Sequence, residues 1–332
     1  MPELPDIQLY IDTIAERVVG HAIEKIRFAS PFVLRTVFPP AAAFAHKKIT
    51  GLERIGKRIV FVCEGDLFLV IHLMIAGRFR WFPEANAKIP GKLGLAAIDF
   101  AHGTLVLTEA STKKRASINL FEGRAALAKV DPGGLEPLTA TVKTFGEALR
   151  RENHTLKRSL TDPHLFSGIG NAYSDEILHA ARMSPVKLSG KMTDDEVKTL
   201  LDATKKTLVW WTKHLRKETG DAFPEKVTAF RPEMKAHGKF GKPCPDCGTT
   251  IQRIRYASNE TDYCPGCQTG GKLLADRSLS RLLKDDWPKT PEELEEHRAE
   301  RRLPGATPMA APVKKGAAKK AAQSRGKEDP PR

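Results

Sequence analysis

Four cysteines in the carboxyl-terminal third constrain this chain more than any other feature. They form two CxxC pairs, Cys244 with Cys247 and Cys264 with Cys267, and sixteen residues separate the pairs. Pairs at this separation place four thiolates tetrahedrally around Zn²⁺, as in zinc ribbons. Because four ligands leave no open coordination position, we assign the predicted zinc to structure and not to catalysis.

The segment between the two pairs predicts a β-hairpin. QRIRYAS alternates in polarity, which is typical of a strand, and its two arginines are two residues apart. Side chains at this spacing lie on one face of a strand, so Arg253 and Arg255 are expected to point the same way. The sequence therefore predicts two neighbouring cations beside the zinc.

The net charge of +14 indicates a polyanionic partner. Residues 304–332 carry seven basic and two acidic side chains, so most of the excess charge lies elsewhere on the chain. Nucleic acid is the commonest partner of such a surface, and a merely soluble basic surface is the alternative. No apolar run approaches the length of a membrane span, and no basic segment followed by an apolar stretch marks a secretory signal. We expect a cytoplasmic protein without a membrane partner.

Residues up to about 121 predict one helix followed by many strands. Apolar side chains recur at helical spacing after Asp6, the expected N-cap: Ile7, Tyr10, Ile11, Ile14 and Val18. AIEKIRF, RIVFVC, LFLVIH and TLVLTE then alternate or run apolar, and EGD is a natural hairpin turn. Because no long helical pattern intervenes, an antiparallel sandwich or barrel is favoured over a βαβ fold.

The first six residues, MPELPD, contain a possible nucleophile. Met1 is usually removed when proline follows, and its removal leaves Pro2 with a free secondary amine. A terminal amine titrates near pH 7.7 to 8, so a useful fraction is unprotonated and nucleophilic at neutral pH. These six residues alone favour the alternative of a frayed, solvated terminus.

The second half of the chain predicts helices after a linker, DPGGLEPL. In LFSGIGNAYSDEIL, two glycines permit a tight turn, and Asn171 opens a helix whose exposed N–H groups suit a phosphate. Lys157 on the preceding helix supports that role, although GxGN alone also fits an ordinary corner between helices. Lys57 in GKRIVF begins a strand where sandwich loops emerge, so it can reach a site, but a solvated lysine is the commoner case.

Several motifs in one order carry a resemblance to a known family. PELPD, GKRIV, the HLxxxGR stretch at 72–78, LKRSLTD with GIGNAYSDEIL, and the four cysteines together resemble the formamidopyrimidine-DNA glycosylase/endonuclease VIII family over roughly residues 2–270. The resemblance implies an α+β fold with an N-terminal helix and antiparallel β-sandwich, a helix-two-turns-helix domain and a C-terminal zinc-finger β-hairpin. Damaged double-stranded DNA would run through the cleft between the lobes.

The resemblance also implies domain boundaries and a setting for the protein. We expect a catalytic sandwich in 1–130, the helix-two-turns-helix domain in 131–225, the zinc finger in 226–275, and a charged extension with a disordered basic tail in 276–332. We further expect a monomer of the bacterial cytoplasm with one structural zinc and no small-molecule cofactor.

The chemistry that the family implies gives the amino terminus a purpose. The Pro2 amine would attack C1′ of the damaged nucleotide, displace the base and form a Schiff base, after which β- and δ-elimination cleave the strand. Glu3 resembles the acid/base residue, and Lys57 resembles the lysine that contacts phosphate and assists base departure. Asn171, with Lys157, resembles the phosphate clamp. The nucleotide must leave the duplex for any of these steps.

The chain departs from the family pattern where the vacated base stack is filled. Ile75 stands where a methionine is common, and the TKKRAS loop puts Lys113, Lys114 and Arg115 where two arginines and a phenylalanine are expected. Asn259 replaces an arginine that binds phosphate, a role that Arg253 or Arg255 can partly take over. The lesion spectrum and the preference for the opposite base are therefore left open.

Three functions are consistent with the sequence. The first is a DNA-formamidopyrimidine glycosylase and DNA-(apurinic or apyrimidinic site) lyase acting on ring-opened purines and 8-oxoguanine, with a preference for oxidised pyrimidines or abasic sites as a close alternative. The second is a non-catalytic reader of damaged DNA. The third is a zinc-ribbon protein that binds RNA or ribosomes, and it gives no reason for the PELPD start.

Overall fold

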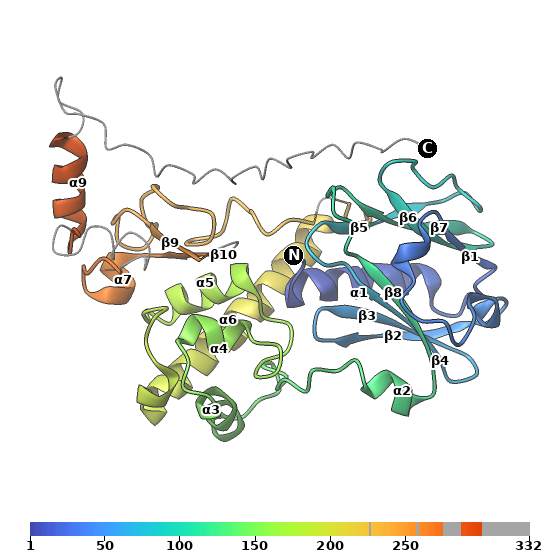
Figure 1. The fold of residues 1–332 in the computed structure, drawn as a ribbon, viewed down its shortest axis with the longest axis horizontal. Coiled ribbons are helices and arrows are strands. Elements are labelled where there is room, and N and C mark those ends of the chain that lie inside the picture. Colours follow the sequence, from blue (N-terminus) through green and yellow to red (C-terminus); the bar gives the residue numbers. More distant parts are fainter. Residues whose placement is uncertain (226, 257–258, 275–286, 301–332) are drawn as a thin grey trace, which may run out of the picture. The chain divides into compact units, whose positions relative to one another are not determined.

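The computed structural model describes residues 1–225, 227–256, 259–274 and 287–300 (Figure 1). The chain forms two units, Met1–Pro291 and Glu292–Arg332. Within the described residues, every helix is too short or too polar to cross a membrane. Helix α9, Pro291–Glu300, covers most of the charged segment near the carboxyl terminus. The predicted basic tail lies outside the described residues, as does most of the extension before α9.

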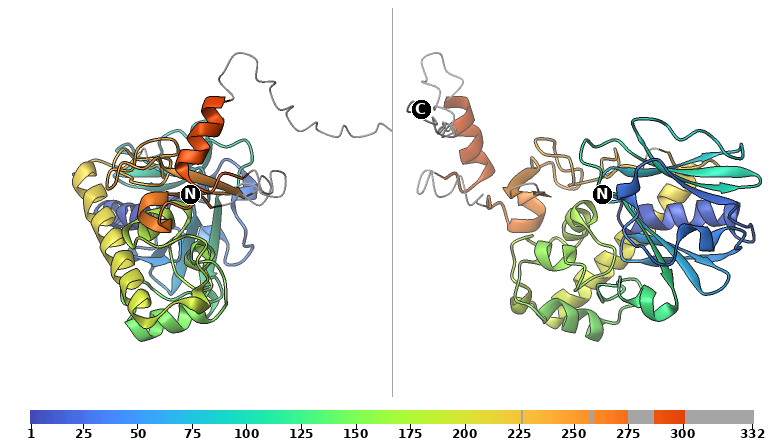
Figure 2. Two further views of the ribbon diagram at one scale, coloured as in Figure 1. Left: turned by 90° about the vertical axis from the view of Figure 1, so that its left-hand side faces the viewer. Right: turned by 45° about the vertical axis from the view of Figure 1, so that its right-hand side comes forward.

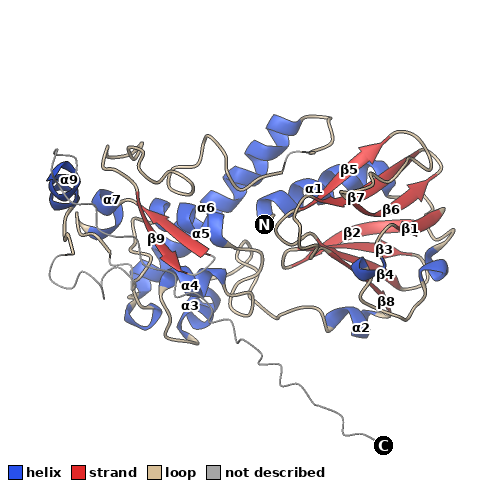
Figure 3. Ribbon diagram, turned by 45° about the horizontal axis from the view of Figure 1, so that its top comes forward, coloured by secondary structure: helices blue, strands red, loops and turns tan. Residues whose placement is uncertain are grey.

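The amino-terminal part of the first unit is a sandwich of two antiparallel sheets, drawn in red in Figure 3. One sheet has the order β1-β6-β7-β5 and the other β2-β3-β4-β8. The strands are β1 (Lys25–Phe28), β2 (Ile49–Ile55), β3 (Arg58–Cys63), β4 (Leu67–His72), β5 (Gly77–Phe82), β6 (Gly94–Phe100), β7 (Gly103–Glu109) and β8 (Ser117–Glu122). The short 3-10 helices η1 (Pro31–Val33) and η2 (Ala41–Phe44) lie between β1 and β2. The predicted sandwich is confirmed, and EGD is the turn between β3 and β4.

Helix α1, Leu4–Val18, belongs to two apolar cores at once. Ile7 and Ile14 lie in the core that both sheets share, whereas Leu4 and Leu9 lie in the core of the helical part. The helix begins earlier than expected, because Glu3 is the N-cap and the Asp6 carboxylate accepts a hydrogen bond of 3.0 Å from the main-chain N–H of Glu3. Residues 2–6 are therefore a buried helix start and not a frayed arm.

Five helices follow the sandwich, and all but the first of them pack around a second core (Figure 2). They are α2 (Arg124–Ala128), α3 (Val142–Arg150), α4 (Leu156–Thr161), α5 (Asn171–Ala180) and α6 (Asp194–Thr219), with the 3-10 helix η3 (Ser189–Lys191) before α6. Thr141, Thr155 and Thr193 accept the hydrogen bonds that cap α3, α4 and α6. Helix α5 contacts both α4 and α6, so most of its surface is buried.

The carboxyl-terminal part of the first unit contains the predicted hairpin. Strands β9 (Gln252–Tyr256) and β10 (Asn259–Tyr263) pair antiparallel, and α7 (Pro265–Thr269) follows them. The apolar cluster of this part is small and consists of Ile251 with the cysteines. Because so little apolar surface is buried here, the hairpin needs another source of stability, which the predicted zinc supplies.

Candidate active site and metal centre

A pocket of about 510 Å³ lies where the amino terminus, the sandwich, α5 and the zinc hairpin meet. It is lined by Met1, Glu3, Lys57, Ile75, Asn171, Ala172, Ala229, Phe230, His237, Arg255 and Glu260. The structure thus brings together five of the residues that the sequence singled out, from segments that are far apart in the chain. The other predicted DNA-binding residues do not line this pocket.

The carboxylate of Glu3 is held at the amino-terminal end of α5. It accepts main-chain hydrogen bonds from Gly170 at 2.6 Å, Ala172 at 2.8 Å and Tyr173 at 3.2 Å. The side chain is 3% exposed, so solvent does not compete for these bonds. Free amides at a helix start and the positive end of the helix dipole favour a negative charge. The amides that we expected to be open for a phosphate are bound to Glu3 instead.

The glycines of GIGN are required by this close approach. A Cβ on Gly170 would lie 2.6 Å from Glu3 Cδ and 2.6 Å from Lys57 Nζ, which is closer than carbon atoms in contact allow. Gly168 has φ of +80°, and a Cβ there would meet Leu4 Cβ at 2.9 Å. The motif therefore lets the α5 turn rest directly on the start of α1.

The amino terminus lies against this carboxylate. Pro2 is buried, and Met1 lines the pocket. Burial lowers the pKa of the terminal amine on Met1, while the charge of Glu3 acts to raise it. A lowered pKa enlarges the unprotonated, nucleophilic fraction of an amine at neutral pH.

Lys57 lies in the two-residue turn between β2 and β3, one residue before the strand in which we expected it. Its side chain is partly buried in the pocket. Burial lowers the pKa of Lys57, the charge of Glu3 raises it, and that of Lys157 lowers it. Burial and a second lysine thus act against the charged form of Lys57.

A buried set of charged groups adjoins the pocket, and one of them, His237, lines it. Lys157 Nζ donates to the main-chain oxygen of Asn171 and to Asp175 Oδ1, each at 2.6 Å. Its ammonium group is thus bound within the protein. His237 Nδ1 lies 2.8 Å from Asp175 Oδ2 and 3.9 Å from Asp262. Burial acts to lower the pKa of His237, but Asp175 outweighs it and the pKa is raised.

Three residues of α5 escaped the sequence analysis: Asp175, Glu176 and His179. Glu176 accepts main-chain hydrogen bonds of 2.8 to 2.9 Å from Lys235, Ala236 and His237. It thereby fixes the segment that passes from α6 to the hairpin. In SDEILH these residue types are typical of a solvated face, and only packing on every side reveals that they are buried.

The TKKRAS loop lies between β7 and β8 and folds over a buried carboxylate. Glu109 accepts main-chain hydrogen bonds from Arg115 at 2.8 Å and from Ala116 at 2.9 Å. The Lys114 ammonium group donates to the main-chain oxygen of Glu109. The side chains of Lys113, Lys114 and Arg115 are exposed, but the loop does not line the pocket.

Ile75 occupies the turn between β4 and β5, and its side chain is 57% exposed at the pocket. The residue before it, Met74, has φ of +52°. Arg78 donates hydrogen bonds to the main-chain oxygens of Ile75 and Gly77. The exposed side chain of Ile75 therefore projects from a turn whose main chain is held by hydrogen bonds from Arg78.

The two hairpin arginines have different surroundings although they share a strand face. Arg255 lines the pocket. Arg253 lies 4.3 Å from the centre of the Phe240 ring and pairs with Glu260 at 3.2 Å. The side chain of Asn259 lies outside what the structure describes.

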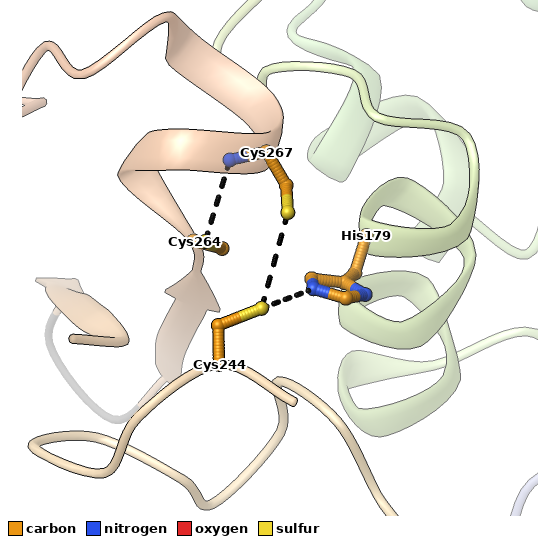
Figure 4. A group of neighbouring side chains, drawn as sticks. All are labelled: His179, Cys244, Cys264 and Cys267. Carbon is orange, nitrogen blue, oxygen red and sulfur yellow. Dashed lines mark hydrogen bonds between the residues drawn. The ribbon is translucent and has the colours of Figure 1, made fainter. Parts of the chain in front are cut away.

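The four cysteines converge as the spacing predicted. Cys244 Sγ lies 3.9 Å from Cys267 Sγ, and Cys247 Sγ lies 3.3 Å from Cys264 Sγ. Tetrahedral zinc with Zn–S bonds of about 2.3 Å separates its sulfur ligands by about 3.8 Å. The donor set and its spacing therefore fit one structural zinc. A fifth group lies at this cluster, the His179 imidazole of α5, which Figure 4 shows beside Cys244, Cys264 and Cys267.

Three successive parts of the chain match models of known protein domains. Residues 1–118 match the formamidopyrimidine-DNA glycosylase N-terminal domain, and residues 134–215 match the H2TH domain of that glycosylase. Residues 241–270 match a zinc finger found in FPG and IleRS. The formamidopyrimidine-DNA glycosylase of Ligilactobacillus salivarius is 31% identical over 281 residues, which span 81% of this chain and 99% of that protein.

Solved structures agree with the sequence matches. A Lactococcus lactis FPG mutant in complex with Fapy-dG containing DNA has 27% identity and a TM-score of 0.70, over 81% of this chain and 100% of that chain. MutM in complex with carbocyclic 8-oxo-G containing DNA has 26% identity and the same TM-score and coverage.

Proposed function

We propose, from the premise that this chain belongs to the formamidopyrimidine-DNA glycosylase and endonuclease VIII family, that it is a DNA glycosylase acting on damaged DNA. We further propose that it cleaves the abasic site that it leaves. The observation that supports this most directly is the Glu3 carboxylate, which three amides of α5 hold beside the amino terminus in a pocket.

In the proposed reaction the amine of Pro2 is the nucleophile. After removal of Met1 it attacks C1′ of a flipped nucleotide, and the base leaves with the electron pair of the glycosidic bond. The attacking nitrogen loses its proton, and the C1′–O4′ bond of the sugar then breaks as Glu3 protonates O4′, so that the nitrogen lone pair forms an iminium with C1′. This iminium is cationic without a further proton, because proline is a secondary amine. Loss of a proton from C2′ then expels the 3′ phosphate, and a second elimination expels the 5′ phosphate.

Glu3 and Lys57 support this sequence of steps. Glu3 moves protons at the sugar, and the amides of α5 keep its carboxylate in one orientation. Lys57 meets a backbone phosphate at the pocket, where a nearby negative charge favours its ammonium form. Asn171 and Arg255 line the same pocket and are proposed to bind phosphates on either side.

The functional division that we propose assigns catalysis to residues 1–130, DNA binding by the paired helical turns to 131–225, and the zinc finger to 226–275. Lys113, Lys114 and Arg115 extend the DNA surface beyond the pocket, since all three are exposed. Lys157 and Arg253 contribute through the groups that they hold in place, Asn171 and Glu260.

Ring-opened purines and 8-oxoguanine are the proposed substrates. Relatives at 26 to 27% identity were solved on DNA with Fapy-dG and with carbocyclic 8-oxo-G, which supports this choice. Excision assays on duplexes that carry oxidised purines, oxidised pyrimidines or an abasic site test it. Cleavage of pyrimidine lesions alone would contradict the purine assignment and favour the close alternative.

Borohydride trapping tests the enzyme assignment itself. Purified protein is incubated with duplex DNA containing an abasic site or 8-oxoguanine, and borohydride is added to reduce a Schiff base to a stable protein–DNA adduct. The matched control retains an N-terminal extension that blocks Pro2, since Pro2→Gly would leave a terminal amine. We expect an adduct that the extension abolishes. Tight binding without trapping on any lesion would show a non-catalytic reader of DNA.

A further inference from the structure

The zinc centre has a fifth donor group, which α5 supplies. His179 is 1% exposed, and its Nε2 lies 3.2 Å from Cys244 Sγ. The ligand atoms of His179, Cys244, Cys264 and Cys267 all lie within 4.8 Å of one another. In Figure 4 the imidazole points from the helix toward the sulfur atoms. Three thiolates and one imidazole are themselves a complete tetrahedral donor set for zinc.

Cys247 is the one cysteine of the four that is not a member of this group of mutually close ligand atoms. It is exposed, whereas Cys244 and Cys264 are buried and Cys267 is partly buried. Its Sγ contacts Cys264 at 3.3 Å and Thr249 Oγ1 at 3.4 Å, both of them on the side of the hairpin. Five groups thus surround a place where zinc takes four, and Cys247 is the one most open to solvent.

We propose that His179 is an alternative zinc ligand, which hydrogen-bonds Cys244 while four thiolates hold the metal and takes the place of Cys247 when that thiolate is lost. This proposal concerns the metal centre and does not depend on which DNA lesion is the substrate. A ligand from α5 would join the hairpin to the helical part through the metal itself.

The surroundings of the imidazole suit both states. While Cys247 is bound, Nε2–H donates to the Cys244 thiolate, as groups around zinc ligands commonly do. When His179 becomes a ligand, the proton resides on Nδ1, which lies 3.9 Å from Asp246 Oδ2. Lys235 holds the other carboxylate oxygen of Asp246 at 2.8 Å. A carboxylate beyond a zinc-bound histidine is the usual arrangement that orients its ring.

The test is the zinc content of the untagged full chain after dialysis against a chelator of moderate affinity. We expect Cys247→Ser to keep one zinc per chain and Cys247→Ser with His179→Phe to lose it. His179→Phe alone should keep zinc, because four cysteines remain, and it thereby checks that the phenylalanine does not unfold the protein. Equal zinc content in the Cys247→Ser variant with and without His179 would overturn the proposal.

Cys264→Ser is the matched control for position. Cys264 is buried and belongs to the group that His179 joins, whereas Cys247 does not. We expect Cys264→Ser to lose zinc even with His179 present, because Cys247 lies outside the group whose ligand atoms are all within 4.8 Å of one another, and only three members of that group remain. Zinc retention in this variant equal to that of Cys247→Ser would mean that any serine substitution is tolerated, which contradicts a specific replacement.

Cobalt provides a readout that a merely structural histidine would not move. In Co²⁺-loaded Cys247→Ser, the sulfur-to-metal charge-transfer band should correspond to three thiolates, and the visible bands should shift to shorter wavelength as nitrogen replaces sulfur. His179→Phe in the same background should remove the shifted bands. Unshifted bands in Cys247→Ser would show that another group fills the position.

Discussion

Helix α5 is held differently at its two ends. At its start, main-chain amides of Gly170, Ala172 and Tyr173 bind the Glu3 carboxylate. Near its end, one side chain, His179, contacts the zinc ligand Cys244. Main-chain donors persist through almost any substitution, so the first contact is set by shape, whereas the second depends on a single imidazole. The contact at the proposed catalytic end therefore tolerates changes of side chain but not added bulk. The contact at the metal end tolerates added bulk better but is lost when the histidine is replaced.

Zinc removal should have the largest effect, and it acts at the metal end. A structural site contributes on the order of 10 kcal/mol or more in small zinc peptides, and little apolar surface is buried in the hairpin. We expect chelation to unfold the hairpin and abolish DNA binding while the two larger cores stay folded. Binding by fluorescence anisotropy and unfolding by circular dichroism measure the two effects. DNA affinity that survives metal removal would contradict this prediction.

Gly170→Ala tests the crowding at the other end. Its Cβ would lie 2.6 Å from both Glu3 Cδ and Lys57 Nζ, so these groups must move. Because misplacement by about 1 Å can cost 10²-fold in rate, we expect base excision to slow by roughly that factor or more. Gly51→Ala is the control, since a Cβ there meets nothing within 4 Å and its φ is not positive. Equal rates of base excision in the two variants would show that Glu3 and Lys57 can move aside without loss of activity.

The two hairpin arginines connect the metal end with the pocket to different extents. Arg255 lines the pocket, while Arg253 stacks on Phe240 and pairs with Glu260. We expect Arg255→Ala to weaken DNA binding about tenfold and to lower the slope of log affinity against log salt by about 1. Arg253→Ala should change the salt slope less. A larger decrease in the salt slope for Arg253→Ala than for Arg255→Ala would mean that Arg253, and not Arg255, contacts the phosphate.

We expect the smallest effect from the pair of Asp175, in the middle of α5, and His237. It is a dependence of thermal stability on pH. Burial acts to lower the pKa of His237, but the hydrogen bond and the charge of Asp175 outweigh it and raise the pKa above its ordinary value, so the folded state binds that proton more tightly than the unfolded chain. The stabilisation is complete below about pH 6.5, the unfolded value, and is lost as the pH rises through the folded pKa. We expect Tm to fall by roughly 1–4 °C more in the native protein than in His237→Gln between pH 6 and 8.5. Parallel Tm curves would contradict this.

Much of the fold was predictable because local patterns reported it. Alternating strands and their hairpin turns predicted the sandwich, and the apolar spacing from Ile7 to Val18 predicted α1. The start of α1 was wrong by a few residues, since Asp6 resembles an N-cap but Glu3 takes that position. Capping preferences alone do not reveal that Leu4 packs into a second core. That packing lets α1 begin before Asp6.

The site was predictable only as separate pieces. The sequence named Glu3, Lys57 and Asn171, and the structure places all three on one pocket. The sequence did not indicate that Glu3 would bind the amides at the start of α5, where we expected a phosphate. That contact joins residues 167 positions apart in the chain. Asp175 and His179 were also missed, because their residue types predict a solvated face.

The four zinc-binding cysteines, the antiparallel sheets and the family resemblance could all be read from the amino-acid sequence, because each depends on spacing within a short stretch of chain. Only the tertiary structure decided what each charged group meets. Burial depends on neighbours from distant segments, so the same Asp and His are solvated in one fold and sealed in another. In this protein that difference puts Glu3 on the amides of α5 and His179 on the thiolate of Cys244.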